Sequence, residues 1–158
     1  MIAKIISGGQ TGADRAALDF AIDNNIPHGG WIPKGRITEA GQLPDKYQLQ
    51  EMATTSYDKR TEQNVIDSDG TVIVSHGNLT GGSALTQTFA IKHYKPCLHL
   101  DMNNTTIIEA ADSLNNWIRK NNIMTLNVAG PRVSKDDKTY QVTRDLLEAV
   151  FIKDKSHG

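Results

Sequence analysis

The sequence of 158 residues lacks several features that would assign it to a particular class of protein. It contains one cysteine, Cys97, so neither an intramolecular disulfide nor a multi-cysteine zinc site can form within one chain. No stretch approaches the roughly 18 apolar residues of a membrane span. The apolar run at the N-terminus is too short for a signal peptide. We therefore expect a cytoplasmic protein with no membrane partner.

An excess of positive charge is also missing. The chain has 17 lysines and arginines against 18 aspartates and glutamates, which gives a net charge of -1. This balance argues against a nucleic-acid partner. The histidines show no metal-ligand spacing, so we predict no metal site. A hydrophobic fraction of 38% and a charged fraction of 22% fit a soluble globular protein, and the length fits one domain over residues 1–158.

Short apolar runs alternate with segments of helical period. The apolar runs predict strands over 2–7, 29–32, 71–75, 97–101 and 124–129, and the periodic segments predict helices over 12–25, 58–68, 83–94, 105–122 and 138–153. Regular alternation is typical of parallel strands joined by right-handed crossovers. The predicted fold is therefore a three-layer, Rossmann-like α/β fold: a mainly parallel sheet of about five strands with helices on both faces.

Residues 33–47 carry Pro33, Gly35, Gly41 and Pro44 with little periodicity. A loop of this length in a compact domain is more often a lid or binding loop than a plain connector. We predict that its two cations, Lys34 and Arg36, close over phosphates of a ligand.

A glycine-rich loop follows the first predicted strand and opens the first helix. Glycine lets the backbone approach a ligand closely, and the amides and dipole at a helix N-terminus favour an anion. The candidate ligand-binding residues of this loop are Gly8, Gly9, Gln10, Thr11, Gly12, Asp14 and Arg15. The alternative is a tight turn with Asp14 near the start of the helix.

A second loop of similar composition follows the strand at 71–75. Its candidate ligand-binding residues are His76, Gly77, Thr80, Gly81, Gly82 and Ser83. His76 either faces the ligand as a general acid or base or bonds a loop carbonyl. Ser83 is also a candidate helix N-cap.

Three further side chains extend the predicted pocket. Arg132 directly follows the last strand, where it can pair with an anion or lie in solvent. Arg60 and Asn64 are four residues apart on a predicted helix and share a face. A surface salt bridge is the alternative role for Arg60.

These motifs together resemble the molybdenum-carrier family, a branch of the SLOG, or lysine-decarboxylase-like, superfamily of Rossmann-like proteins. The segments that carry the resemblance are Ser7-Gly-Gly-Gln-Thr-Gly-Ala-Asp-Arg15, Gly30-Trp-Ile-Pro-Lys-Gly-Arg36, Arg60-Thr-x-x-Asn64, Ser68-Asp-Gly-Thr71 and Gly81-Gly-Ser83. The resemblance implies a small phosphate-bearing ligand, either the molybdenum cofactor or a nucleotide. It also implies a homo-oligomer.

One motif departs from the related phosphoribohydrolases, whose second loop resembles Pro-Gly-Gly-x-Gly-Thr-x-x-Glu. Here the glutamate position falls on Thr88, and Ala84-Leu85 replace the inner Gly-Thr. This favours a cofactor carrier over a nucleosidase-like, nucleotide-processing enzyme, in which Asp14, His76 and Arg60 would be the reactive groups. A nucleotide sensor whose 33–47 loop closes is a further alternative.

Overall fold

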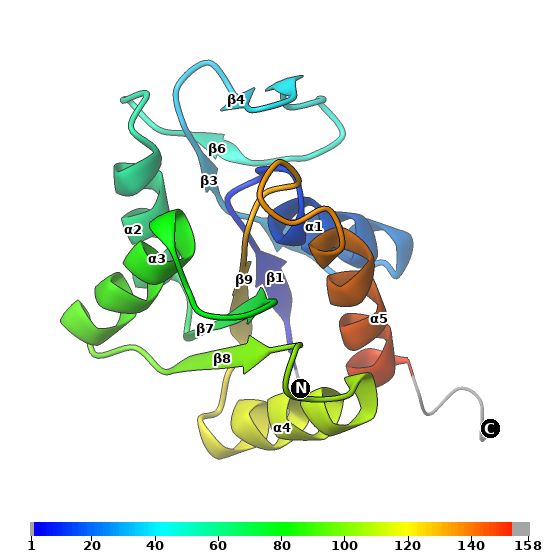
Figure 1. Cartoon of the computed structure of the whole chain (residues 1–158). Coiled ribbons are helices and arrows are strands. Elements are labelled where there is room, and N and C mark those ends of the chain that lie inside the picture. The colour runs from blue at the N-terminus through cyan, green and yellow to red at the C-terminus, as the bar shows by residue number, and fades with distance from the viewer. Residues whose placement is uncertain (1, 153–158) are drawn as a thin grey trace.

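Five parallel strands form the main sheet of the protein, whose computed structural model describes residues 2–152 (Figure 1). Their order across the sheet is β2-β1-β9-β7-β8. The bounds are Lys4–Ile6 for β1, His28–Gly29 for β2, Gly70–Ser75 for β7, Cys97–Asp101 for β8 and Thr125–Ala129 for β9. Each of the predicted strands contributes one strand to this sheet, so the predicted fold class is confirmed.

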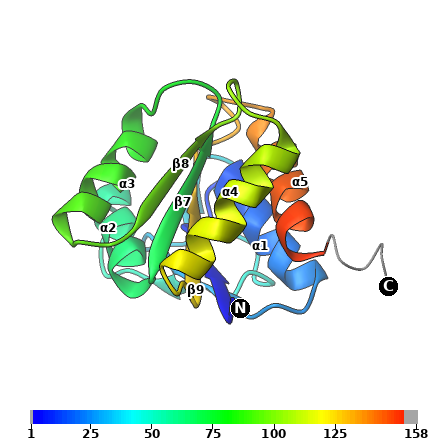
Figure 2. The ribbon, with the colours of Figure 1, turned by 90° about the horizontal axis from the view of Figure 1, so that it is seen from below.

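Helices cover both faces of the sheet, as predicted. Figure 2 shows α2 and α3 on one side of the strands and α1, α4 and α5 on the other. The bounds are Ala13–Asp23 for α1, Tyr57–Asp67 for α2, Gly81–Lys92 for α3, Ile107–Lys120 for α4 and Thr139–Phe151 for α5. Among the described residues, no helix is long and apolar enough to cross a membrane.

The last strand in the chain lies in the middle of the sheet. Leu126 of β9 is in register with Ile5 of β1, and Val128 of β9 is in register with Val72 of β7. If β9 is counted as the first strand and the others follow in chain order, the order across the sheet becomes 3-2-1-4-5. This is the Rossmann order. The sheet is thus a Rossmann sheet in which the strand that counts as the first, β9, comes after the other four in the chain.

The main core lies between the sheet and the layer of α1, α4 and α5. Central strand residues such as Val72 and Leu126 pack there with Phe20, Leu114 and Leu147, all fully buried. The sequence sets the start of α4 through a capping box: the Thr106 hydroxyl accepts from the Glu109 amide, and the Glu109 carboxylate accepts from the Thr106 amide. The small alanines of α1 allow its close approach to the sheet.

The single strand predicted over 29–32 is wrong. Gly30 has a φ of 123°, and this kink separates β2 in the main sheet from β3, Trp31–Ile32. Strand β3 instead pairs in parallel with β6, Gln50–Glu51. Asn64 holds the kink, because its side-chain amide accepts from the Trp31 N–H at 2.8 Å and donates to the Trp31 carbonyl at 3.1 Å.

Residues 33–47 are more ordered than a plain loop. They contain a hairpin of β4, Ile37–Thr38, and β5, Gly41–Gln42. Arg36 donates hydrogen bonds to four backbone carbonyls of this excursion, those of Leu43, Pro44, Tyr47 and Leu49. Leu43, Tyr47 and Leu49 are buried with Leu18 and Ile32 in a second, smaller core.

The Gly30 kink predicts a large destabilisation for Gly30→Ala. An added Cβ would lie 2.2 Å from the Ser7 carbonyl oxygen, on a backbone conformation that only glycine adopts easily. We expect a loss of about 3 kcal/mol in the free energy of unfolding, measured by urea denaturation. The matched control is Gly82→Ala, where an added Cβ meets nothing within 4 Å. If the two variants were equally stable, the backbone kink at Gly30 would not be what requires glycine at this position.

Candidate functional site

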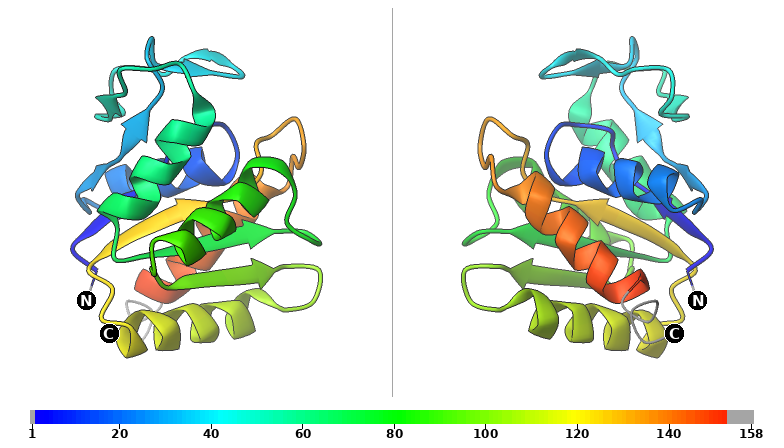
Figure 3. Two further views of the ribbon diagram at one scale, coloured as in Figure 1. Left: turned by 90° about the vertical axis from the view of Figure 1, so that its left-hand side faces the viewer. Right: turned by 90° about the vertical axis from the view of Figure 1, so that its right-hand side faces the viewer.

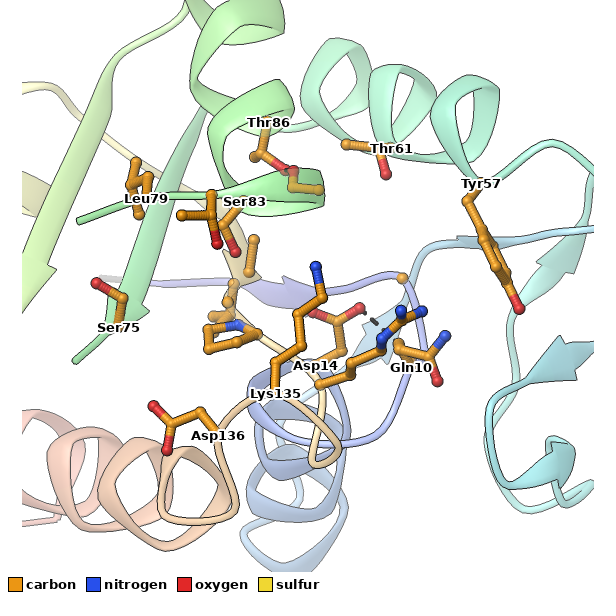
Figure 4. A pocket seen from close by; sticks show the side chains of 18 of the residues that line it. Gln10, Asp14, Tyr57, Thr61, Ser75, Leu79, Ser83, Thr86, Lys135 and Asp136 are labelled. Carbon is orange, nitrogen blue, oxygen red and sulfur yellow. Dashed lines mark hydrogen bonds between the residues drawn. The ribbon is translucent and has the colours of Figure 1, made fainter. Parts of the chain in front are cut away.

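A cavity of about 470 Å³ opens at the carboxyl ends of β1, β7 and β9 (Figure 4). In Rossmann-like sheets ligands bind at this edge, where the strand order reverses. Counted from β9, the reversal lies between β9 and β7, and the loops after these strands, 76–80 and 130–138, both contribute to the lining. Figure 3 shows these loops at the same end of the sheet. The permuted order therefore places the cavity where the fold class expects a ligand.

The N-terminus of α3 forms one wall of this cavity. Thr80, the N-cap, makes no side-chain capping bond, and the amides of Gly81 and Gly82 have no acceptor among residues 2–152. The ammonium group of Lys135 approaches this helix end: it lies 2.7 Å from where a Cβ on Gly81 would stand. Figure 4 shows Lys135 reaching across the cavity from the loop after β9. Two sources of positive potential thus meet at one point.

The first glycine-rich loop holds an anion of its own, the carboxylate of Asp14. Oδ2 of Asp14 accepts from the Gln10 amide at 3.3 Å, and the Ser7 hydroxyl donates to the Asp14 carbonyl at 2.9 Å. Burial raises the pKa of Asp14 to about 6, because desolvation outweighs the opposing effects of Arg60 and of the loop amides. The loop amides thus already face a carboxylate, which occupies the position predicted for a ligand anion.

Arg60 projects from α2 to the floor of the cavity. It is 7% exposed, and its Nη1 donates to the Gly8 carbonyl. Its guanidinium lies 5.5 Å from the centre of the Tyr57 ring, a residue at the cavity rim. Desolvation lowers the pKa of Arg60, although the nearby Asp14 charge opposes this. Arg60 is therefore held by a backbone carbonyl and lies near the charge of Asp14.

Glu39 fastens the β4–β5 hairpin to the cavity rim. Its carboxylate accepts from the hydroxyls of Thr11 and Ser134 and from the Ser134 amide at 3.1 Å, and lies 3.4 Å from Arg132 Nε. Although desolvation opposes the effect, the hydrogen bonds from Ser134 and Thr11 lower the pKa of Glu39. One carboxylate thus joins the hairpin, the first loop and the loop after β9. We call this group the Glu39 latch.

Many of the predicted site residues do meet in the cavity. Those that line it are Gly8, Gln10, Asp14, Arg60, Asn64, His76, Thr80, Gly82, Ser83 and Arg132. The others lie outside its lining: Gly9, Thr11, Gly12, Arg15, Lys34, Arg36, Gly77 and Gly81.

Structural partners explain the position of three of the residues outside the lining, Gly12, Arg15 and Arg36. Gly12 packs against the Pro131 carbonyl, 2.2 Å from where its Cβ would stand. Arg15 donates to the Gly9 carbonyl and lies 5.1 Å from the centre of the Tyr47 ring. Arg36 donates to the backbone carbonyls of its own segment. The exposed Lys34 makes only a backbone contact, to Thr54.

Several lining residues were not among the predicted ones. Tyr57 and Thr61 come from α2, Thr86 from α3 and Asn127 from β9, and Lys135 and Asp136 come from the loop after β9. Lys135 and Asp136 follow Gly130-Pro131-Arg132 so closely that the same strand-end argument covers them. The spacing of Ser83 and Thr86 on one helix face could also have indicated Thr86.

The position of Thr88 is informative for the comparison with phosphoribohydrolases. Thr88 is exposed on α3, and its hydroxyl donates to the Ala84 carbonyl at 3.2 Å. It does not line the cavity, whereas Ser83 and Thr86 do. The position aligned with the missing glutamate is therefore turned away from the site.

Comparison with known proteins gives the family. The model of the circularly permutated YpsA SLOG family matches residues 5–151. The chain belongs to this family. The family's permutation agrees with the sheet order, in which the strand that counts first comes last in the chain.

A solved structure from Syntrophus aciditrophicus SB, described as a "putative molybdenum carrier protein", is 61% identical to this SLOG-family chain. The match covers 95% of each chain with a TM-score of 0.94. This supports the resemblance inferred from the sequence motifs. A search of curated proteins found none that matches the chain.

Burial of Asp14 predicts a specific pH dependence of stability. Its pKa is about 6 in the folded protein against an ordinary value of 3.8, so the folded state holds the proton more tightly than the unfolded state. Its contribution is therefore greatest at low pH and is lost as pH rises from about 4 to about 6. Relative to wild type, Asp14→Asn should gain about 2 kcal/mol in the free energy of unfolding between pH 4 and pH 7.

Urea denaturation of both proteins across this range measures the difference. The matched control is Asp45→Asn, an exposed carboxylate in the 33–47 segment, which should show no such trend. A pH-independent difference between wild type and Asp14→Asn would mean that Asp14 titrates normally.

The Glu39 latch predicts that Glu39→Gln releases the hairpin. An amide has a single acceptor oxygen and no charge, so the bonds from Thr11 and Ser134 and the attraction to Arg132 weaken together. Hydrogen exchange of residues 37–42 should accelerate by about tenfold or more, with little change in β7 and β9. Glu148→Gln, on the exposed side of α5, is the control. Unchanged exchange in the hairpin would show that the latch is not what holds it.

Proposed function

We propose that the protein binds a small phosphate-bearing molecule in the main cavity and acts as a carrier of the molybdenum cofactor, a pterin phosphate. The observation that carries this proposal is the approach of the Lys135 ammonium group to the uncapped N-terminus of α3. A cation beside the positive end of a helix dipole is unfavourable by itself. An anion between the two gains from both.

Lys135 also differs from the other cations at this site. Arg132 lies 3.4 Å from the Glu39 carboxylate, and Arg60 donates to the Gly8 carbonyl near the charge of Asp14. Among residues 2–152, the Lys135 ammonium has no hydrogen-bond or ion-pair partner. A phosphate at this point would bring negative charge and acceptor oxygens for the exposed Lys135 and for the Gly82 amide at the cavity wall.

The rest of the cavity suits a heterocyclic group attached to that phosphate. Its volume of about 470 Å³ lies within the usual range of small-molecule sites. Tyr57 offers an aromatic surface at the rim, and Thr61, Thr86 and Asn127 add polar side chains to the lining. A pterin, with its several donors and acceptors on a flat ring, matches this chemistry.

Two further observations favour carriage over turnover. Thr88, at the position of the glutamate of the phosphoribohydrolases, is exposed and lies outside the cavity lining. The structural relative at 61% identity carries the description of a molybdenum carrier. We therefore expect the protein to bind its ligand and not to convert it into a product.

Native mass spectrometry of gently purified protein, with molybdenum and phosphorus analysis of the same sample, tests the cargo. A co-purified pterin with molybdenum would support the proposal. A protein that binds no pterin phosphate or nucleotide in titrations would overturn it. If the protein converted added nucleotides, ADP-ribose or NAD into products, it would be an enzyme and not a carrier.

Removing the charge of Lys135 should weaken phosphate binding. We expect Lys135→Gln to raise the dissociation constant for AMP by about tenfold in isothermal titration calorimetry, because a charge-assisted bond to the phosphate is lost. Lys120→Gln, at the exposed end of α4, serves as the charge-matched control and should bind like wild type. Equal affinities of Lys135→Gln and wild type would place the phosphate elsewhere.

A further inference from the structure

The carboxylate of Asp14, in the lining of the main cavity, is only partly used by the protein itself. Asp14 is 9% exposed, and Figure 4 shows it beside Gln10 in the cavity. The Gln10 backbone amide donates to its Oδ2 at 3.3 Å, and the Gly8 amide also faces the carboxylate. Because an ionised carboxylate has about four acceptor positions, capacity to accept further hydrogen bonds remains.

The two cations near Asp14 do not use this capacity. Arg60 donates to the Gly8 carbonyl, and Arg15 donates to the Gly9 carbonyl at 3.3 Å. Within residues 2–152, neither arginine forms an ion pair with Asp14. With a pKa of about 6, Asp14 is mostly ionised at neutral pH. A buried, ionised acceptor is therefore available to a molecule in the cavity.

The side chain of Gln10 places a donor beside this acceptor. Its Oε1 accepts from the backbone amides of Thr11 at 3.1 Å and of Glu39 at 2.9 Å. Its Nε2 has no partner among the described residues 2–152. Gln10 lines the same cavity and is also 9% exposed, so a hydrogen bond from Nε2 to a ligand would form largely away from water.

The charges around these two side chains limit what they can bind. An anion beside Asp14 would be repelled by its carboxylate, and a cation would be repelled by the nearby Arg60 and Arg15. A neutral group that carries N–H donors next to a carbonyl oxygen satisfies both Asp14 and Gln10. A 2-amino-4-oxopyrimidine ring has this sequence along one edge: a carbonyl, a ring N–H and an amino group.

We propose that Asp14 and Gln10 bind the 2-amino-4-oxopyrimidine edge of a heterocyclic ligand, an edge that pterins and guanine share. The Asp14 carboxylate accepts from the ring N–H and the amino group, and Gln10 Nε2 donates to the carbonyl oxygen. This assignment rests on the proposed function, since it places the ring of the bound molecule. It depends on neither Lys135 nor the N-terminus of α3.

Isothermal titration calorimetry with two matched pairs of probes tests the assignment on the full chain. Lumazine is pterin with a carbonyl oxygen in place of the amino group, and IMP is GMP without that amino group. Pterin should bind about tenfold or more tightly than lumazine, or GMP than IMP, because a charge-assisted hydrogen bond to Asp14 is lost. A preference within either pair supports the assignment, and the larger ratio identifies the ring.

Asp14→Asn should abolish this preference. The asparagine oxygen can still accept from the Gln10 amide, so its NH₂ group would meet the donors of the ligand. The two members of each pair should then bind within about twofold of each other. Asp45→Asn, the exposed control, should keep the wild-type ratio. Urea denaturation of the same two variants shows that each is folded.

Equal binding within both pairs by the wild-type protein would overturn the assignment, and so would a ratio that Asp14→Asn leaves unchanged. If AMP binds in either case, the proposed phosphate site stands without the ring assignment. If neither AMP nor any of the four probes binds, the proposed function fails as well.

Discussion

The buried carboxylate of Asp14 is the interaction on which the site depends. It gives the amides of the first loop an acceptor inside the protein and offsets the charge of Arg60, which in turn bonds the Gly8 carbonyl. The loop after β1 and helix α2 are thereby held together without a ligand. A carboxylate at this depth keeps a raised pKa, so the arrangement is maintained at a cost that the surrounding bonds must offset.

This internal balance determines which charges remain for a ligand. Arg132 forms an ion pair with Glu39, whereas Arg60 donates to the Gly8 carbonyl and lies near the charge of Asp14. Lys135 faces the start of α3 instead. The cation that we expect to bind an anionic ligand therefore lies at one wall of the cavity, although other cations also line it. A count of cations in the sequence would have distributed the expected anion contacts over several loops.

The sequence predicted the sheet, its helices and the edge at which the cavity lies, because alternation and strand-end composition are local signals. It did not predict the kink at Gly30, since a glycine within an apolar run also occurs in continuous strands. It also assigned Arg36 and Arg15 to a ligand. Their partners are backbone carbonyls and an aromatic ring brought near by the excursion around residues 36–49, and such contacts leave no trace in spacing.

The roles within the predicted loops were equally hard to read from residue types alone. In the sequence, Asp14 and Gln10 both look like ligand contacts. In the structure, the Asp14 carboxylate accepts a hydrogen bond from the backbone amide of Gln10. Lys135 is an exposed lysine in a polar loop, and the strand-end argument that indicated Arg132 extends to it. Its approach to the start of α3, however, requires the assembled sheet and could not be predicted from the sequence.

The central position of β9 has a consequence for how the protein comes to be folded. During synthesis β1 and β7 emerge before the strand that must separate them, and they pair with each other nowhere in the finished sheet. Until β9 arrives, each has an unsatisfied hydrogen-bonding edge facing a gap. Such edges invite wrong pairing, and contacts between distant parts of a chain form slowly. The nascent chain thus depends on β9, which follows the other strands of the sheet in the chain, to close the sheet, and a ribosome-bound fragment lacking β9 should be a client for chaperones.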